Sequence, residues 1–168
     1  MKSAGRVFLI GDIRGTSDSG SPIDGQGYTG YSSTPAPVLR YRLDSTSLAR
    51  MEAPDTVVTG MPDGGHGSRS LAFDDAGNLF VNVGSDSNAC WSGRALDTCP
   101  ELEERGGIWR YDAARLQEVH DVAQRVANGI RNAVGLARNT DLHALFATQH
   151  GRDALHNTYP KLYSVEER

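Results

Sequence analysis

The chain has 168 residues and a formal net charge of −4 at pH 7, with 38% hydrophobic and 23% charged residues. This length fits one domain or part of a larger one, and this composition allows a folded core. The acidic balance and the lack of a basic run argue against nucleic acid as the main partner. No apolar run reaches the roughly 18 residues of a membrane-spanning helix. Nineteen glycines and seven prolines favour short strands and turns over long helices.

The first predicted strand is the apolar run Val-Phe-Leu-Ile at residues 7–10. This run is too short for the hydrophobic region of a signal peptide. We therefore expect either a cytoplasmic chain or a parent sequence that begins upstream of residue 1.

Four kinds of segment recur along the chain at intervals of about 65 to 70 residues, which indicates a repeat architecture. Residues 79–84 resemble 7–11 and 145–151, residues 39–44 resemble 108–112, residues 56–60 resemble 125–129, and residues 67–73 resemble 130–136. Each repeat therefore predicts about four short strands, and tandem four-stranded units are typical of a β-propeller. We interpret residues 1–168 as one partial propeller domain of the all-β class.

The number of repeats is small for this architecture. The chain holds about two and a half units, whereas a closed propeller needs at least about four blades. An open array leaves strand edges unpaired. We therefore expect a fragment of a longer propeller or a chain that self-associates through its open blade edges.

A helix at residues 112–126 competes locally with the repeat. Leu116, Val119, Ala123 and Val126 recur at helical spacing. The repeat instead predicts a strand near residues 124–127, and we favour the repeat.

Polar residues gather at both ends of a predicted hairpin. Its strands are residues 71–73 and 79–83, joined by a turn in which Gly77 is free to take positive φ. The polar residues are His66, Ser68 and Arg69 before the hairpin, and Asn82, Ser85, Asp86 and Asn88 at its end. Such positions commonly carry function in β scaffolds.

Two long loops, residues 12–37 and 85–107, separate the second and third strands of their units. Loops of this length are usually functional or disordered. Tyr28, Tyr31 and Trp91 either line a sugar-binding mouth or only hold the loops in place. Cys90 and Cys99 either form a disulfide, which favours an oxidising compartment, or remain two thiols.

His66 is the first candidate for chemistry. It lies between two glycines, which allow close approach of the backbone to a ligand, and histidine is the usual general base near neutral pH. The alternative is a surface histidine in a flexible turn. We interpret His120, His143 and His156 as surface residues, because they form no recognised ligand spacing with one another.

Arg131 and Asn132 occupy the repeat position of residues 68–69, so a propeller would bring them together with His66 and Arg69 near its axis. An arginine suits carboxylates and other anionic oxygens, and an asparagine offers both a donor and an acceptor. The alternative is an arginine that joins adjacent blades by binding carbonyl groups.

The run from Gln149 to Asp153 ends a predicted strand and forms a second candidate pocket wall. Asp86 and Asp153 are the carboxylates best placed to hold a histidine or a hard cation such as Ca²⁺. The alternative is that they cap turns of the backbone.

Several motifs in order resemble those of the soluble pyrroloquinoline-quinone (PQQ) sugar dehydrogenases, above all the sorbosone dehydrogenase-like branch. The motifs are at residues 65–69, 71–81, 106–112, 129–136, 149–151 and 155–159, and the resemblance covers roughly residues 37–165. The resemblance implies a six-bladed propeller with PQQ and Ca²⁺ on one face. It also implies a sugar substrate, an electron acceptor and a periplasmic or secreted location.

The same resemblance implies roles for catalytic residues. His66 would take the proton from the sugar C1 hydroxyl while hydride passes to the quinone, and Arg131 would stabilise the quinone oxygen as it gains negative charge. Asp86 would orient His66, although glucose-oxidising members carry that aspartate one position earlier, where this chain has Ser85.

Further residues would bind the cofactors. The resemblance assigns PQQ to Asn132 and Gln149, together with Arg131, and places Gly151 near the Ca²⁺ site. We add Arg69 to the PQQ-binding residues because of its expected place near the axis, and Asp153 to the Ca²⁺ site because of its carboxylate.

Two alternatives stay open. One is a non-catalytic propeller fragment that binds a partner or self-assembles. The other is a lactonase-like propeller hydrolase, which needs a carboxylate-containing metal cage near the axis. The strand ends here offer Asn82, Gln149 and His150 in place of such a carboxylate, so we rank the hydrolase third.

Overall fold

The structure is a computed structural model that describes residues 5–10, 37–43, 47, 53–62, 65–66, 69–88, 99–158 and 160–163. The expectations for Tyr28, Tyr31 and Trp91 lie outside these residues. Cys99 is disulfide-bonded, and Cys90, the other cysteine of the chain, lies outside the described residues.

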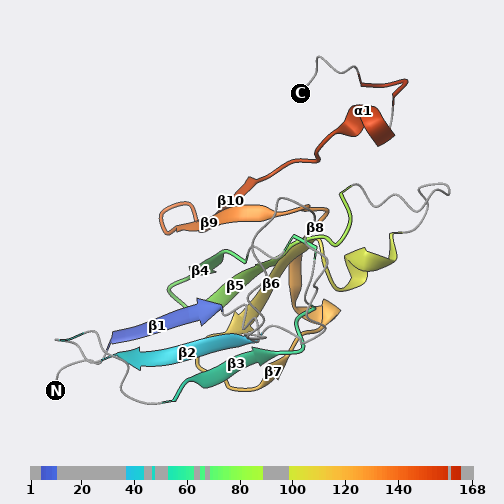
Figure 1. The fold of residues 1–168 in the computed structure, drawn as a ribbon. Helices are drawn as coiled ribbons and strands as arrows, with labels where there is room; N and C mark the ends of the chain where they lie inside the picture. The colour runs from blue at the N-terminus through green and yellow to red at the C-terminus, as the bar shows by residue number, and fades with distance from the viewer. Residues whose placement is uncertain are drawn as a thin grey trace.

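The ten strands in the described part of the chain form three sheets (Figure 1). Sheet A has the order β1 (Gly5–Ile10), β2 (Val38–Leu43), β3 (Asp55–Thr59) and β7 (Glu118–Val119). Sheet B has the order β4 (Leu71–Phe73), β5 (Asn78–Val83), β6 (Gly107–Asp112) and β8 (Arg125–Asn128). Sheet C pairs β9 (Ala133–Asn139) with β10 (Ala144–Gln149). All neighbouring strands are antiparallel except β3 and β7, which are parallel.

Helical segments are short. They are the 3₁₀ turns η1 (Pro100–Glu103) and η2 (Val122–Gln124) and the helix α1 (Leu155–Thr158). Within the described ranges, the chain has no helix with the length and apolarity required to span a bilayer.

The predicted all-β class is confirmed, and strands occur where the repeat predicts them. The repeat segments at 7–11, 79–84 and 145–151 correspond to β1, β5 and β10. Sheet B forms a four-stranded antiparallel unit, as the repeat predicts. Among the described strands, none of the three sheets closes on itself, so the arrangement of the units as propeller blades stays a prediction.

The alternative helix at residues 112–126 is wrong. This stretch holds β7 and η2, and it ends in β8. Its apolar residues do not form a buried stripe, because Leu116, Val119 and Val126 are 48%, 64% and 48% exposed. Without a buried apolar face, helical spacing alone does not stabilise a helix of this length.

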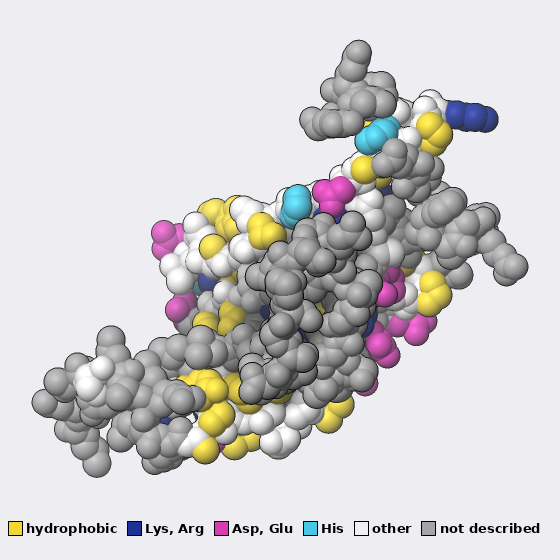
Figure 2. Space-filling model, in the orientation of Figure 1, with side chains coloured by type: hydrophobic (Ala, Val, Ile, Leu, Met, Phe, Trp, Pro, Cys, Tyr) yellow, Lys and Arg dark blue, Asp and Glu magenta, His cyan; other side chains and the backbone are white. Residues whose placement is uncertain are grey.

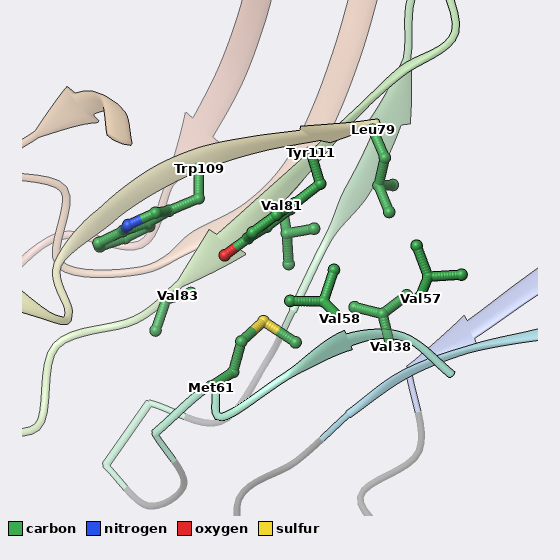
Figure 3. Close-up of a cluster of buried hydrophobic side chains, with 9 residues drawn as sticks. All are labelled: Val38, Val57, Val58, Met61, Leu79, Val81, Val83, Trp109 and Tyr111. Carbon is green, nitrogen blue, oxygen red and sulfur yellow. The ribbon is translucent and has the colours of Figure 1, made fainter. Parts of the chain in front are cut away.

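The main core lies between sheets A and B (Figure 3). Successive side chains of a strand point to opposite faces, so alternate residues of β5 and β6 share the face that points toward β2 and β3. The nine buried residues of this cluster are Val38, Val57, Val58, Met61, Leu79, Val81, Val83, Trp109 and Tyr111.

The opposite face of sheet B faces sheet C and is packed less tightly. Phe80 and Ile108 lie on this face, where a cavity of about 470 Å³ extends to Leu145 of β10. On sheet C, Val134 and Phe146 are 52% and 50% exposed, and Figure 2 shows apolar side chains at the surface over this region. Sheet C therefore leaves apolar surface without cover among the described residues.

His120 is partly buried, so its assignment to the surface is wrong. Its imidazole Nε2 lies 2.9 Å from the Glu104 carbonyl, and its Nδ1 lies 2.6 Å from the Tyr111 hydroxyl. The ring is stacked at a tilt on Trp109, with the ring centroids 4.8 Å apart. These partners fit a neutral imidazole that donates to the carbonyl and accepts from the hydroxyl. Burial accordingly lowers the pKa of His120 and raises the pKa of Tyr111.

Shortening the buried side chain of Leu79 tests whether the cluster between sheets A and B stabilises the fold. We expect Leu79→Ala to lower the free energy of unfolding by about 2 to 5 kcal/mol, because it leaves a cavity between two sheets. Leu142→Ala is the matched control, since Leu142 is 66% exposed, and we expect it to change stability by about 0.5 kcal/mol or less. Urea unfolding measures both, and equal costs would contradict the assigned core.

The His120 network predicts a pH dependence of stability. Because the folded state lowers the pKa of His120, the unfolded chain binds more protons, and stability falls as the pH drops through the ordinary histidine pKa of about 6.5. The loss levels off once the pH is below the folded-state pKa. His120→Gln removes this titration. We therefore expect the stability advantage of the wild type over this variant to shrink between about pH 7.5 and about pH 5, and an advantage that grows on acidification would contradict the network.

Candidate functional site

Three strand ends meet at one place in the structure. The backbone N–H of Ser85, just after β5, donates to the Arg131 carbonyl at 2.7 Å. The backbone N–H of Arg131 donates to Gln149 Oε1 at 3.1 Å, and the N–H of His150 donates to the Asn132 carbonyl at 2.9 Å. These bonds bring most of the predicted site residues to one end of sheets B and C.

His66 is held by the carbonyl of Ser85. The imidazole Nδ1 lies 2.7 Å from this oxygen, and the backbone N–H of His66 donates to the same oxygen at 3.0 Å. Ser85 Oγ lies 3.3 Å from Nδ1 and donates its own proton to the Ser87 carbonyl. Because both neighbours of Nδ1 are acceptors, we assign the proton of the neutral ring to Nδ1. Nε2 then carries the free lone pair.

Two glycines allow His66 to lie this close to the end of β5. A Cβ at Gly84 would overlap the backbone of His66, and a Cβ at Gly65 would lie 2.5 Å from Asp86 Cα. Gly65 also has a φ of +57°, which disfavours any residue with a side chain. The absence of a side chain at Gly65 therefore lets the backbone next to His66 pack directly against the turn at residues 85–86.

Asp86 does not contact His66. Its side chain is 63% exposed, and its carboxylate lies 3.9 Å from Arg105 Nη1. The group that binds the His66 ring at Nδ1 is instead the carbonyl of Ser85. The reason is the one-residue offset, because neighbouring side chains at a strand end point in opposite directions.

Glu101, on η1, was missed by the sequence analysis. Its Oε2 accepts the backbone N–H of Asp86 at 2.5 Å and that of Ser87 at 2.9 Å. Its Oε1 accepts the hydroxyl of Ser87. The carboxylate therefore binds the turn that holds His66. In the sequence, Glu101 is one of several acidic residues near Pro100, and no motif distinguishes it.

Arg131 is a buried cation that joins the segment after β10 to the site. Its side chain is 7% exposed. Nη1 donates to the Gly151 carbonyl at 2.8 Å and Nη2 to Asp153 Oδ2 at 2.5 Å, while the buried Nε has no partner among the described residues. Asp153 is also tied to Asn88, whose side-chain amide makes two hydrogen bonds with the Asp153 backbone, of 2.6 and 2.9 Å.

The residues proposed for Ca²⁺ do not fit a cation in this arrangement. The guanidinium of Arg131 already occupies the space between the Gly151 carbonyl and the Asp153 carboxylate, and two adjacent cations would repel. In the described part of the chain, no three side chains of His, Cys, Asp or Glu are grouped to hold a metal ion. The metal cage of a lactonase-like hydrolase is likewise not found among these residues.

Asn132 and Arg69, which were expected to bind the cofactor, are bound to other parts of the protein. The buried Asn132 accepts, at its Oδ1, a hydrogen bond of 3.0 Å from Asn82 Nδ2, and Asn82 Oδ1 accepts the N–H of Ala133 at 3.1 Å. Arg69 Nη2 donates to the Pro62 carbonyl. Asn82 itself is fully buried. The sequence signal for this link is an asparagine within the otherwise apolar run of residues 79–83.

A pocket of about 300 Å³ includes Ser85, the residue whose carbonyl binds His66, while His66 itself is not part of the lining. Of the residues predicted to bind a cofactor, Arg131 and Gln149 line this pocket, whereas Arg69 and Asn132 do not. The pocket lining consists of Ser85, Ser87, Asn88, Glu101, Leu102, Gly106, Gly129, Ile130, Arg131, Gln149, Arg152 and Leu155. The pocket therefore contains two arginines and two amide side chains, those of Asn88 and Gln149, and it connects to the candidate base through Ser85.

The Asn82 link predicts a stability effect. Asn82→Ala leaves Asn132 Oδ1 and the Ala133 N–H without these partners, and each unsatisfied buried group costs about 1 to 3 kcal/mol. We therefore expect a loss of about 2 to 6 kcal/mol in the free energy of unfolding. The control is Asn128→Ala, at an exposed asparagine whose side chain accepts one hydrogen bond, from the N–H of its neighbour Gly129. A loss no larger than that of the control would contradict the link.

Comparison with known families gives one match. The family model described as TrAA12-like matches residues 12–166. This match overturns the assignment to the sorbosone dehydrogenase-like branch of the soluble PQQ sugar dehydrogenases. The comparison with curated proteins found no match, and the comparison with solved structures also found none. Since the matched model spans most of the sequence, the chain belongs to the TrAA12-like family.

Proposed function

We propose that the chain is part of a PQQ-dependent oxidoreductase that oxidises a hydroxyl group, with the C1 hydroxyl of an aldose-type sugar as the substrate class. The observation that carries the proposal is the state of His66. Its Nδ1 is bound to the Ser85 carbonyl, so Nε2 carries the lone pair that can accept a proton, and Ser85 also lines a pocket that contains two arginines. Membership of the TrAA12-like family supports it, because that family points to PQQ-related oxidoreductases.

The hydrogen-bond donors in the pocket lining support an anionic quinone as the ligand. PQQ carries carboxylates, and arginine binds carboxylates through several N–H groups. Arg131 offers the buried Nε that lacks a partner among the described residues, and Arg152 and Gln149 add a cation and an amide to the lining. Glu101, the acidic residue in the lining, is already bound by the N–H groups of Asp86 and Ser87. Arg131, Arg152 and Gln149 are therefore the residues that would hold PQQ.

In the proposed reaction, the substrate loses a proton to His66 and a hydride to the cofactor. PQQ, when bound, supplies the two-electron acceptor for the hydride that leaves the carbon atom of the substrate. His66 Nε2 accepts the hydroxyl proton as the C–H bond breaks and the carbonyl group forms. The ring is then an imidazolium, and its Nδ1–H remains bound to the Ser85 carbonyl, which stabilises the positive charge.

We also infer that sheets A, B and C are successive blades of a propeller. The chain-order antiparallel arrangement of β4, β5, β6 and β8 supports this, as does the recurrence of the same sequence segments in all three sheets. A periplasmic or secreted location accompanies the proposal, and the disulfide bond of Cys99 is in keeping with an oxidising compartment.

The alternative of a non-catalytic, self-associating module has one observation in its favour. Val134 and Phe146 leave apolar surface on sheet C, and β10 is an edge strand of that sheet among the described strands. A stable oligomer whose size and stability do not change when PQQ is added would favour this alternative.

The proposed function is tested by titrating the full chain with PQQ and then assaying aldose-dependent dye reduction. We expect saturable binding near one PQQ per chain. We expect His66→Ala to lower turnover by about 10² to 10⁴-fold while the PQQ dissociation constant changes by less than about tenfold. His143→Ala is the matched control, since His143 lies in the exposed turn between β9 and β10, and it should leave both values unchanged.

Two results would contradict the proposal. Undiminished turnover of His66→Ala would remove His66 as the base. If the wild-type chain does not bind PQQ at high micromolar concentration, the proposed role of PQQ is wrong. The self-associating module is then the better explanation.

A further inference from the structure

We infer that Glu101 is a positioning residue for His66, and that it acts through the peptide group between Ser85 and Asp86. The inference deepens the proposed function, because His66 accepts a proton at Nε2 only while its own proton stays on Nδ1. Among the described residues, the His66 ring is bound by Ser85 and by no carboxylate. The carboxylate of Glu101 instead binds the N–H of the same peptide group whose carbonyl binds His66.

The first step is the contact of Glu101 with the turn. Its Oε2 accepts the backbone N–H groups of Asp86 and Ser87 at 2.5 and 2.9 Å, and its Oε1 accepts the Ser87 hydroxyl. Hydrogen bonds to an ionised carboxylate are roughly twice as strong as neutral ones. Three such bonds on one side chain fix both the position and the orientation of the turn.

The second step is the geometry of the shared peptide. The N–H that Glu101 binds and the C=O that His66 binds belong to the same peptide group, which links Ser85 to Asp86. This group is planar and trans, so its N–H and C=O point in opposite directions. When Glu101 fixes the direction of the N–H, it also fixes the direction of the C=O toward His66 Nδ1.

The third step is electrostatic. A negative charge at the N–H end of a peptide polarises the group and makes its carbonyl oxygen a better acceptor, as in a chain of hydrogen bonds. The order Glu101 carboxylate, peptide N–H, peptide C=O and His66 Nδ1–H forms such a chain. It favours the Nδ1–H tautomer and also the imidazolium that forms during the proposed reaction.

The rest of the turn does not provide a substitute. Ser85 is also held by its N–H bond to the Arg131 carbonyl and by its hydroxyl bond to the Ser87 carbonyl. The first of these bonds belongs to the preceding peptide group, and the second ends on Ser87, whose own N–H and hydroxyl depend on Glu101. The backbone N–H of His66 also donates to the Ser85 carbonyl, at 3.0 Å. That bond holds only the C=O end, so removing Glu101 leaves the N–H end of the peptide group between Ser85 and Asp86 without its carboxylate partner.

The test measures the tautomer of the His66 ring by nitrogen-15 NMR of the full chain with labelled histidine, at a pH where the ring is neutral. We expect the wild type to hold the proton on Nδ1 almost completely. Glu101→Ala should reduce the Nδ1–H fraction to less than half, toward the Nε2–H form that a free imidazole prefers. Glu103→Ala is the matched control on the same 3₁₀ turn, where Glu103 is exposed, and it should keep the wild-type tautomer.

A conservative variant separates positioning from folding. Glu101→Gln keeps the shape and one oxygen acceptor for the two N–H groups but removes the charge, so it should restore most of the Nδ1–H fraction that Glu101→Ala loses. A wild-type tautomer in Glu101→Ala, or a loss in Glu103→Ala equal to that in Glu101→Ala, would overturn the inference. If Glu101→Ala does not fold, Glu101→Gln alone decides: an Nδ1–H fraction below the wild-type value supports the electrostatic step, and an unchanged one overturns it.

The tautomer is measured without quinone or sugar. It therefore tests Glu101 even if the chain fails to bind PQQ, and a failed PQQ titration leaves this result standing. In the active protein, Glu101→Ala should lower kcat with little change in KM, because the base and not the binding of substrate is affected.

Discussion

The guanidinium group of Arg131 is buried where the ends of β5 and β10 meet, and the candidate site depends on how its charge is paired. A buried charge is tolerated only when it is paired and hydrogen-bonded. Here the Gly151 carbonyl and the Asp153 carboxylate bind the guanidinium, while the backbone carbonyl of Arg131 holds the N–H of Ser85. One residue therefore connects sheet C to the turn that orients His66. The same pairing explains why a hard cation does not fit at Gly151 and Asp153.

The site combines fixed and accessible parts. Asn82 and Asn132 form a buried hydrogen-bonded link behind it, and Arg131 and Glu101 fix the strand ends from two directions. Next to these fixed groups, the pocket of about 300 Å³ remains open. Such rigid support at the ends of strands is what a general base needs in order to keep one tautomer.

The sequence predicts the strands well because their signals are local. Alternating apolar residues and turn glycines place β5 and β6, and the repeat carries the same pattern to β1 and β10. His66 and Arg131 are placed near one another by the same reasoning, through their positions at strand ends. Those local motifs mainly specify strands and turns, so they do not decide between related propeller families, and the assignment to the sorbosone dehydrogenase-like branch failed for that reason.

The roles of other residues depend on contacts between distant segments, which no local pattern contains. Glu101 acts only because η1 lies against the turn after β5, and the burial of His120 arises where Trp109 and Tyr111 meet the end of β3. The central claim is that Arg131 and its partners hold the strand ends together as one unit. Native-state hydrogen exchange at the amides of His66, Ser85 and His150 tests it most directly. We expect slow exchange at a common rate for all three amides, and fast exchange at His66 and Ser85 with His150 still protected would contradict this claim.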